Sequence, residues 1–263
     1  MKTSSRTLAI ANLVSLTIVL IVNYLSNSLP LNGKTPGQLS DQYPNLFTPA
    51  GLTFSIWGII YIWLIVLGGF QVAAFFSKRI AAKVEPMLDK IGWLFAYSCL
   101  LNIGWLFAWH WEQILVSVAI MANMLYILTQ LNQAAGVGAS TSSNLEKWLE
   151  HIPFGIYQGW ITVALIANVT AWLVSIGWLG SGIGAPTWAI LMVMVGALLA
   201  LYIIIRQNNW GHGIAVAWAL YGIYLKQTRA ESVDAQMVAW VALALMMTIL
   251  LTLLLRWRKW LAY

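Results

Sequence analysis

Polar and aromatic side chains interrupt one of the most apolar stretches of this chain. Residues 153–173 read PFGIYQGWITVALIANVTAWL, with amide, hydroxyl and indole groups among aliphatic residues. Residues three, four or seven apart share a helical face, so Tyr157, Trp160, Ala164 and Asn168 would line one side of a helix. Large aromatic rings beside an amide could stack on a flat apolar molecule and hydrogen-bond to its edge.

Two other apolar segments carry comparable stripes. Asn102, Trp105 and Trp109 are spaced i, i+3, i+7, and Trp57 lies four residues before Tyr61. The simpler interpretation is that the amides only join helices, where such a bond contributes about 0.6–2 kcal/mol in lipid. The alternative is that the stripes meet around one uncharged, aromatic-lined cavity. The candidate ligand-binding residues are Trp57, Tyr61, Asn102, Trp105, Tyr157, Trp160 and Asn168.

A second face of the same segment predicts helix packing. Gly155 and Gly159 are four residues apart, and small residues at this spacing allow two helices in a membrane to approach closely. We therefore expect Gly155 and Gly159 to contact a neighbouring helix, while the aromatic face looks inward at the second and third apolar segments.

The composition indicates the class of protein that must position these side chains. The chain has 263 residues, of which 60% are hydrophobic and 8% are charged, against roughly 25% charged in a soluble domain. Such a chain cannot cover a water-facing surface, so an integral membrane protein is expected. Among the 16 tryptophans, those at the ends of apolar runs fit interfacial belts.

Eight apolar segments are candidates for membrane-spanning helices. They greatly exceed strand length and lack strict alternation, which favours an all-α integral membrane protein over a barrel. The first begins with basic residues as a signal peptide does, but its apolar run is too long for one. The seventh is the shortest. The eight are Leu8–Leu29, Phe54–Phe76, Ile91–Trp109, Gln113–Leu131, Ile152–Ile176, Thr187–Ile205, Gly211–Leu225 and Ala235–Leu255.

The basic residues predict the orientation of these spans. If the N-terminus is inside, the outer segments hold only Lys34, Lys226 and Arg229 out of 14 Lys and Arg residues. The positive-inside rule then places both termini in the cytoplasm of a multi-pass protein of the cell (inner) membrane. This asymmetry also accounts for the net charge of +6, so no nucleic-acid partner is expected.

The remaining titratable residues do not suggest a catalytic or metal site. No Asp, Glu, Lys or Arg falls well inside a predicted span, which disfavours proton relays and ion coupling. No nucleophile–base pair or carboxylate pair lies within a span, so we predict no catalytic residues and lean against an enzyme. His110, His151 and His212 are scattered at span ends and Cys99 is the single cysteine, so no metal ligands are predicted.

The segment between the first two spans is the longest outer loop. It runs from Pro30 to Thr53 and contains Pro36, Pro44 and Pro49, so it cannot form one regular helix. Long ordered loops often cover a functional site. A cover over the site and an ordinary solvated connector both remain open for this loop.

Three stretches resemble the TspO/MBR family of tryptophan-rich sensory proteins and the mitochondrial translocator protein. They are TPAGLTFSIWGIIY (48–61), LNIGW (101–105) and GWITVALIANVTAW (159–172). The matching positions are Trp57 and Tyr61 in the second helix, Asn102 and Trp105 in the third, and Trp160 and Asn168 in the fifth.

The resemblance covers roughly residues 8–176. It implies a five-helix core over 1–176, followed by an additional three-helix transmembrane segment over 177–263. Two positions depart from the family pattern: the usual Pro-Trp pair before the second helix is replaced around Gly51, and a usual helix proline is Ser55. The pocket wall near this loop is therefore expected to differ.

The resemblance also implies a function. It indicates a membrane receptor, sensor or translocator for hydrophobic planar ligands, namely tetrapyrroles such as protoporphyrin and haem, or sterol-like compounds. No cofactor is required, although a porphyrin or haem could be the bound ligand. A secondary transporter of small solutes and a light-dependent porphyrin-degrading protein remain alternatives. The expected partners are the hydrophobic ligand and membrane lipid. A homodimer stays open, because the last three spans could occupy the surface of a second protomer.

Overall fold

The computed structural model describes residues 1–139, 142–178 and 182–262, with residues 257–262 described by their backbone alone. The described residues form helices and no strand, which confirms the predicted all-α class. The long helices are α1 (Thr3–Ser28), α3 (Ile56–Phe76), α4 (Lys78–Ile91), α5 (Leu94–His110), α6 (Ile114–Ala134), α8 (Ile152–Ser175), α9 (Ala185–Gln207), α10 (Trp210–Gln227) and α11 (Val233–Ala262). The short ones are η1 (Leu31–Gly33), α2 (Pro36–Asp41), η2 (Gly51–Ser55), α7 (Asn144–Glu146) and the π-helical turn η3 (Lys147–His151).

Each predicted span contains a helix, but the predicted count of eight spans is not confirmed. Among the described residues, six helices are long and apolar enough to cross a membrane, or up to seven if the bent pair α4 and α5 forms one span. This pair is bent by 62° at Gly92, whose φ of 52° suits glycine. The helix outside this set is α10, whose buried glycines and His212 lower its hydropathy.

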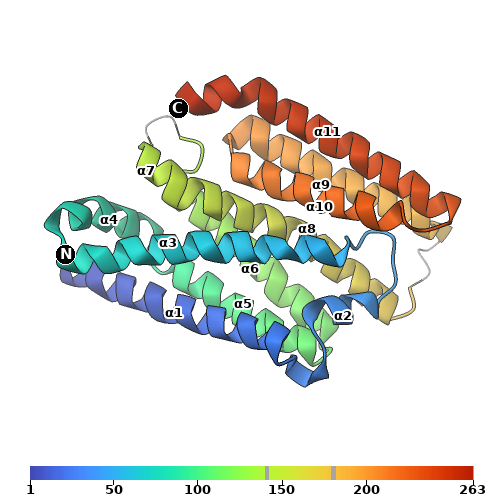
Figure 1. Cartoon of the computed structure of the whole chain (residues 1–263), viewed down its shortest axis with the longest axis horizontal. Coiled ribbons are helices and arrows are strands. Elements are labelled where there is room, and N and C mark those ends of the chain that lie inside the picture. Colours follow the sequence, from blue (N-terminus) through green and yellow to red (C-terminus); the bar gives the residue numbers. More distant parts are fainter. Residues whose placement is uncertain (140–141, 179–181, 263) are drawn as a thin grey trace.

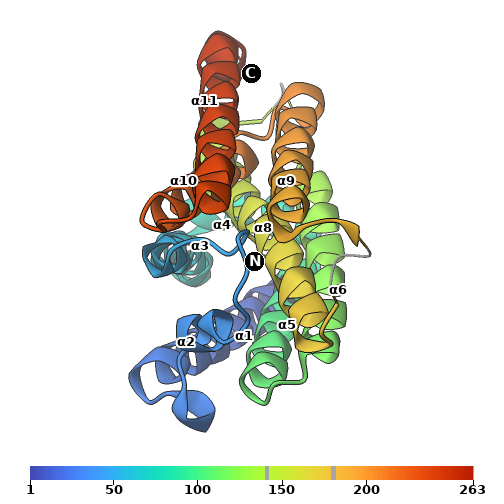
Figure 2. The ribbon, with the colours of Figure 1, turned by 90° about the vertical axis from the view of Figure 1, so that its right-hand side faces the viewer.

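The long helices run back and forth, so that both termini lie at the same end of the bundle (Figure 1). Viewed along the bundle, α8 lies between α9–α11 on one side and α1 with α5 on the other (Figure 2). Helix α8 packs against α3, α6, α9 and α10. The segment with the polar interruptions is therefore the central helix, and its buried polar groups face other helices.

Two glycines of α8 meet α10 directly. A Cβ atom added to Gly155 would overlap the side-chain oxygen of Asn209, and one added to Gly159 would lie 2.8 Å from the Cα atom of His212. The backbones of α8 and α10 are therefore too close at these two positions to leave room for a side chain. This confirms that Gly155 and Gly159 contact a neighbouring helix.

Amide groups add a second connection between these helices. The Asn209 side-chain nitrogen donates to Asn132 of α6 at 3.1 Å and to Gln158 of α8 at 3.2 Å. Gln158 in turn donates to the hydroxyl of Thr129 at 3.0 Å. In a membrane such groups need partners within the protein. The predicted domain boundary after residue 176 consequently falls between closely packed helices.

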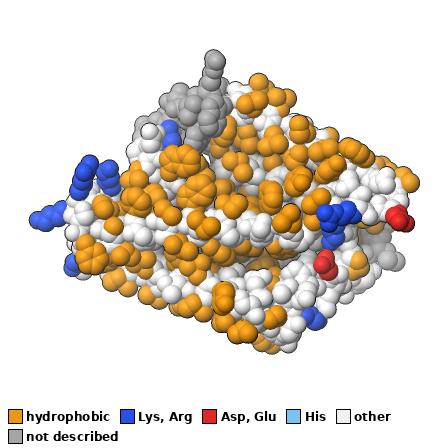
Figure 3. All heavy atoms as spheres, viewed as in Figure 1, with side chains coloured by type: hydrophobic (Ala, Val, Ile, Leu, Met, Phe, Trp, Pro, Cys, Tyr) orange, Lys and Arg blue, Asp and Glu red, His pale blue; other side chains and the backbone are white. Residues whose placement is uncertain are grey.

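Charged residues gather at the ends of the bundle, and the middle of the visible face is mostly apolar (Figure 3). Two of the three basic residues at the end opposite the termini are paired, Lys34 with Glu112 at 3.0 Å and Lys226 with Asp41 at 3.3 Å. The unequal distribution of Lys and Arg between the two ends of the bundle matches the predicted one. The orientation of the bundle in the membrane stays a prediction. The basic residues with described side chains at the end of the termini are Lys2, Arg6, Lys78, Arg79, Lys83, Lys90, Lys147, Arg206 and Arg256.

Candidate functional site

The loop between α1 and α3 folds against the bundle at the end opposite the termini. Its helix α2 begins with a capping box, in which Thr35 and Gln38 bond to each other's backbone N–H. The indole N–H of Trp109 donates to the carbonyl of Pro36 at 3.3 Å, which fixes α2 to α5. Because Pro36 and Thr48 also line the pocket described next, this loop covers it.

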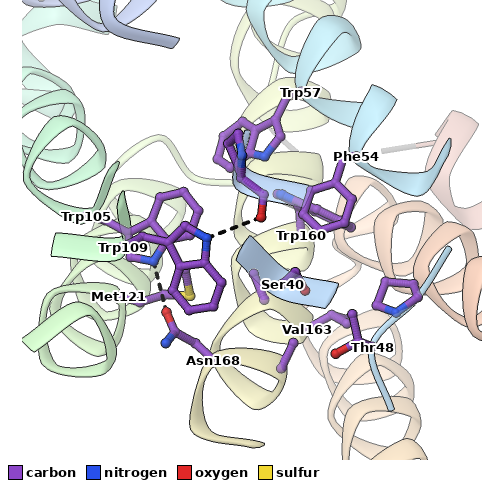
Figure 4. Close-up of a pocket in the computed structure, with 14 residues that line it drawn as sticks. Ser40, Thr48, Phe54, Trp57, Trp105, Trp109, Met121, Trp160, Val163 and Asn168 are labelled. Carbon is purple, nitrogen blue, oxygen red and sulfur yellow. Dashed lines mark hydrogen bonds between the residues drawn. The ribbon is translucent and has the colours of Figure 1, made fainter. Parts of the chain in front are cut away.

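A pocket lies beneath this loop, between α3, α5, α6 and α8 (Figure 4). It is narrow, with a cavity volume of about 40 Å³. None of the described residues that line it is charged. They are Pro36, Ser40, Thr48, Pro49, Phe54, Trp57, Trp105, Trp109, Met121, Trp160, Val163, Ala164, Ala167 and Asn168.

Trp57 joins the aromatic residues of α3 to those of α8. Its ring stacks on Tyr61, with centroids 5.4 Å apart. It meets Tyr157 and Trp160 edge to face, at 5.7 and 6.3 Å. Phe54 contacts Trp160 in the same way at 5.7 Å. The aromatic stripes of α3 and α8 therefore converge, as their spacing predicted.

Trp105 of α5 completes the wall and is held by hydrogen bonds. Its indole N–H donates to Oδ1 of Asn168 at 2.9 Å (Figure 4). Nδ2 of Asn168 donates to the hydroxyl of Ser117 on α6 at 2.9 Å. Trp105 also stacks on Trp109, with centroids 6.1 Å apart. The amide of Asn168 thus positions an aromatic ring at the pocket.

Asn102 and Tyr157 lie behind the pocket and do not line it. Asn102 accepts a hydrogen bond from Asn23 of α1 at 2.9 Å and donates to the hydroxyl of Tyr157 at 3.1 Å. That hydroxyl donates to the sulfur of Met124 at 3.4 Å. These groups connect α1, α5, α6 and α8, so the interpretation that an amide only joins helices holds for Asn102.

One buried polar group of the pocket lining, the indole N–H of Trp160, has no hydrogen-bond partner among the described residues. Trp160 is only 3% exposed and lines the pocket. Buried donors are almost always hydrogen-bonded, so the N–H of Trp160 is a donor that still lacks an acceptor.

The narrow pocket adjoins a larger hollow between α1, α3 and α5. This hollow has a cavity volume of about 680 Å³ and includes Asn23 and Tyr61. Its volume falls within the roughly 300–1,000 Å³ typical of small-molecule sites. The residues common to the pocket and the hollow are Pro36, Phe54, Trp57 and Trp105. Of the seven candidate residues, four line the pocket, Tyr61 lines only the hollow, and Asn102 and Tyr157 line neither.

Sequence reasoning missed the contribution of α10 to this site. The indole N–H of Trp218 donates to the carbonyl of Thr53 at 2.9 Å, and the carbonyl of Gly222 accepts from the N–H of Ala50 at 3.0 Å. Both contacts hold η2, from which Phe54 projects into the pocket. Nothing in the apolar composition of the later spans indicated this role, although Trp218 lies within the predicted span Gly211–Leu225.

Titratable residues contribute little to the site. Among the described residues, no group of three or more His, Cys, Asp and Glu side chains is placed to hold a metal ion. Cys99 is buried as a free thiol. The lining offers aromatic stacking, apolar burial and a few uncharged polar groups, from Ser40, Thr48, Trp160 and Asn168.

The helical bundle and its aromatic pocket define a multi-pass membrane protein with an uncharged pocket among its helices. A family model described as TSPO-like protein matches residues 9–255, and the chain belongs to this family. The match extends beyond the predicted 8–176 and includes α9, α10 and most of α11. Membership supports a membrane sensor or translocator role in the broad sense. No curated protein and no solved structure matches the chain.

Proposed function

We propose that this protein binds a flat hydrophobic molecule in the aromatic pocket and its adjoining hollow, as a membrane sensor or translocator. The expected ligands are tetrapyrroles such as protoporphyrin or haem, or sterol-like compounds. The observation that carries the proposal is the convergence of Trp57, Trp105 and Trp160 from three helices around one uncharged pocket.

The orientation of the rings supports a planar ligand. Trp57 stands edge-on to Trp160 at 85°, so the two rings present a face and an edge to the same space, while Trp105 closes a third side. Aromatic pairs favour such offset and edge-to-face arrangements. A flat ring system can continue this pattern, and an acceptor atom on it would satisfy the N–H of Trp160.

The cavity volumes suggest how a ligand would be accommodated. The pocket holds about 40 Å³ and the hollow about 680 Å³, so a porphyrin-sized molecule would occupy mainly the hollow. Its edge would reach Trp160 between Trp57 and Trp105. The loop around Pro36 covers the narrow pocket. A shift of this loop would widen the pocket.

A ligand titration with matched tryptophan variants tests the proposal. Protoporphyrin is added to the protein in detergent, and the absorbance and fluorescence of the porphyrin itself are followed. We expect Trp160→Phe, which keeps an aromatic ring and removes the N–H, to weaken binding about tenfold, the equivalent of one hydrogen bond of about 1.4 kcal/mol. Trp57→Ala should weaken it further.

Trp93→Phe is the matched control, because Trp93 is 59% exposed and does not line the pocket or the hollow. It should bind as the unmodified protein does. Equal affinity of all variants would remove the proposed site. Competition by haem and by cholesterol then ranks the ligand classes, and porphyrin uptake into proteoliposomes separates a translocator from a sensor.

A further inference from the structure

A polar cavity lies at the opposite end of the bundle from the aromatic pocket. Both termini also lie at this end (Figure 1). Its volume is about 610 Å³. It is bounded by the turn after α6, residues 136–139, by the corner between α9 and α10, residues 205–208, and by Arg256 of α11. Nothing in the proposed ligand-binding function uses this cavity.

The charge of the cavity lining is entirely positive among the described residues. Arg206 and Arg256 line it, and no Asp or Glu does. One guanidinium nitrogen of Arg256 donates to the carbonyl of Ile205 at 3.1 Å. Its Nε is buried and has no partner among the described residues. A buried guanidinium N–H without an acceptor is costly.

Asn208 provides a second unsatisfied group on the same cavity. It is 8% exposed, and both its side-chain oxygen and nitrogen lack a described partner. Its backbone is left-handed, with a φ of 50°, which explains why Asn ends α9 but not why its amide is buried unpaired. By contrast, the adjacent Asn209 uses its amide for α6 and α8.

Helix capping alone does not account for these groups. Arg256 does bond a free carbonyl at the end of α9, and the negative ends of α6 and α9 favour cations nearby. Each helix end, however, carries only about half a charge, whereas the lining holds two full positive charges. The unsatisfied nitrogens of Arg256 and Asn208 are donors that have no acceptor among the described residues, while the unsatisfied oxygen of Asn208 is an acceptor.

We propose that this cavity binds a phosphate group. Phosphate offers several acceptor oxygens and pairs well with guanidinium groups, and the amide of Asn208 would add a neutral donor. Two sources share this chemistry. One is the headgroup of an anionic phospholipid, since basic pockets between helix ends bind such headgroups. The other is a soluble phosphate compound.

A stability assay separates the sources and tests the site. Thermal unfolding of the whole protein in detergent is followed with added phosphatidylglycerol, phosphatidylcholine or inorganic phosphate, at constant ionic strength. We expect phosphatidylglycerol to raise the melting temperature more than phosphatidylcholine, and the apparent affinity to fall about tenfold in Arg206→Gln. Stabilisation by inorganic phosphate alone would assign the site to a soluble compound.

The variants are chosen to fold normally. Arg206 is exposed at the helix end, and Asn208→Gly keeps the left-handed backbone while removing the amide. Arg229→Gln removes the same charge at the other end of the bundle and should respond like the unmodified protein. The proposal fails if neither phosphate source stabilises the protein, or if all variants including Arg229→Gln respond equally.

Discussion

The indole N–H of Trp105 on α5 donates to the side-chain oxygen of Asn168 on α8 over 2.9 Å. Asn168 was predicted as a ligand-binding residue, and it lines the pocket, but its amide is already used by Trp105 and Ser117. Its role in the structure is to hold the ring of Trp105 at the wall. A ligand would then meet the ring before it meets the amide.

Asn168→Ala should destabilise the protein by about 1–3 kcal/mol, because it leaves the N–H of Trp105 buried without an acceptor. The measurement is the free energy of unfolding in mixed micelles. Adding Trp105→Phe to Asn168→Ala removes the unsatisfied donor and should cost less than the sum of the two single changes. If the loss of unfolding free energy in the double variant equals the sum of the two single losses, Asn168 and Trp105 are not coupled.

Gly159→Ala should also be destabilising, since a Cβ atom there would lie 2.8 Å from the Cα atom of His212. Gly69→Ala on α3 is the matched change, because a Cβ atom at Gly69 has no neighbour within 4 Å. It should be neutral or stabilising by up to about 1 kcal/mol, as alanine favours helices more than glycine does. If the two unfolding free energies change alike, α8 and α10 are not in close contact.

Trp218→Phe should weaken porphyrin binding although Trp218 does not line the pocket. The variant loses the hydrogen bond to Thr53 and loosens η2, which carries Phe54. The expected loss is up to about tenfold in affinity, the equivalent of about 0.5–1.5 kcal/mol. Trp93→Phe serves again as the control, and unchanged affinity in Trp218→Phe would show that α10 does not support the site.

We expect the loop over the pocket to become less stable at alkaline pH, because of the hydroxyl of Tyr43. Burial, followed by the negative charge of Glu112, raises the pKa of the Tyr43 hydroxyl above its usual value near 10. Since the folded-state pKa is the higher one, this contribution to stability is present below pH 10 and is lost as pH rises through the folded value. The phenolate absorbance of the unmodified protein minus that of Tyr43→Phe should show one tyrosine titrating above pH 10.

The sequence was most informative where spacing alone decides which side chains share a helical face. Trp160 and Asn168 share one face of α8 and both line the pocket for this reason, and Gly155 on another face contacts α10 as predicted. The rotation of each helix about its own axis is not set by spacing. Contacts with Asn23 and Met124 place Asn102 and Tyr157 behind the pocket, and no pattern within the third or fifth segment specifies those partners.

The count of spans was harder to predict because α10 is enclosed by other helices. A helix in that position can carry glycine, histidine and amide groups whose partners come from distant segments, such as Asn132 for Asn209. Its hydropathy therefore understates how deeply it is buried. The support that Trp218 gives to Thr53 spans 165 residues of sequence, a separation at which local patterns carry no information.

The close contact between α8 and α10 determines how small a functional fragment of this protein can be. A chain that ended after residue 176 would lack α10, so Gly155 and Gly159 would face acyl chains. It would also lose the hydrogen bonds that α10 makes with Thr53 and Ala50. Such a fragment would form a different hollow, even if its own helices inserted correctly. Binding by the entire polypeptide and binding by its first two thirds are therefore separate properties.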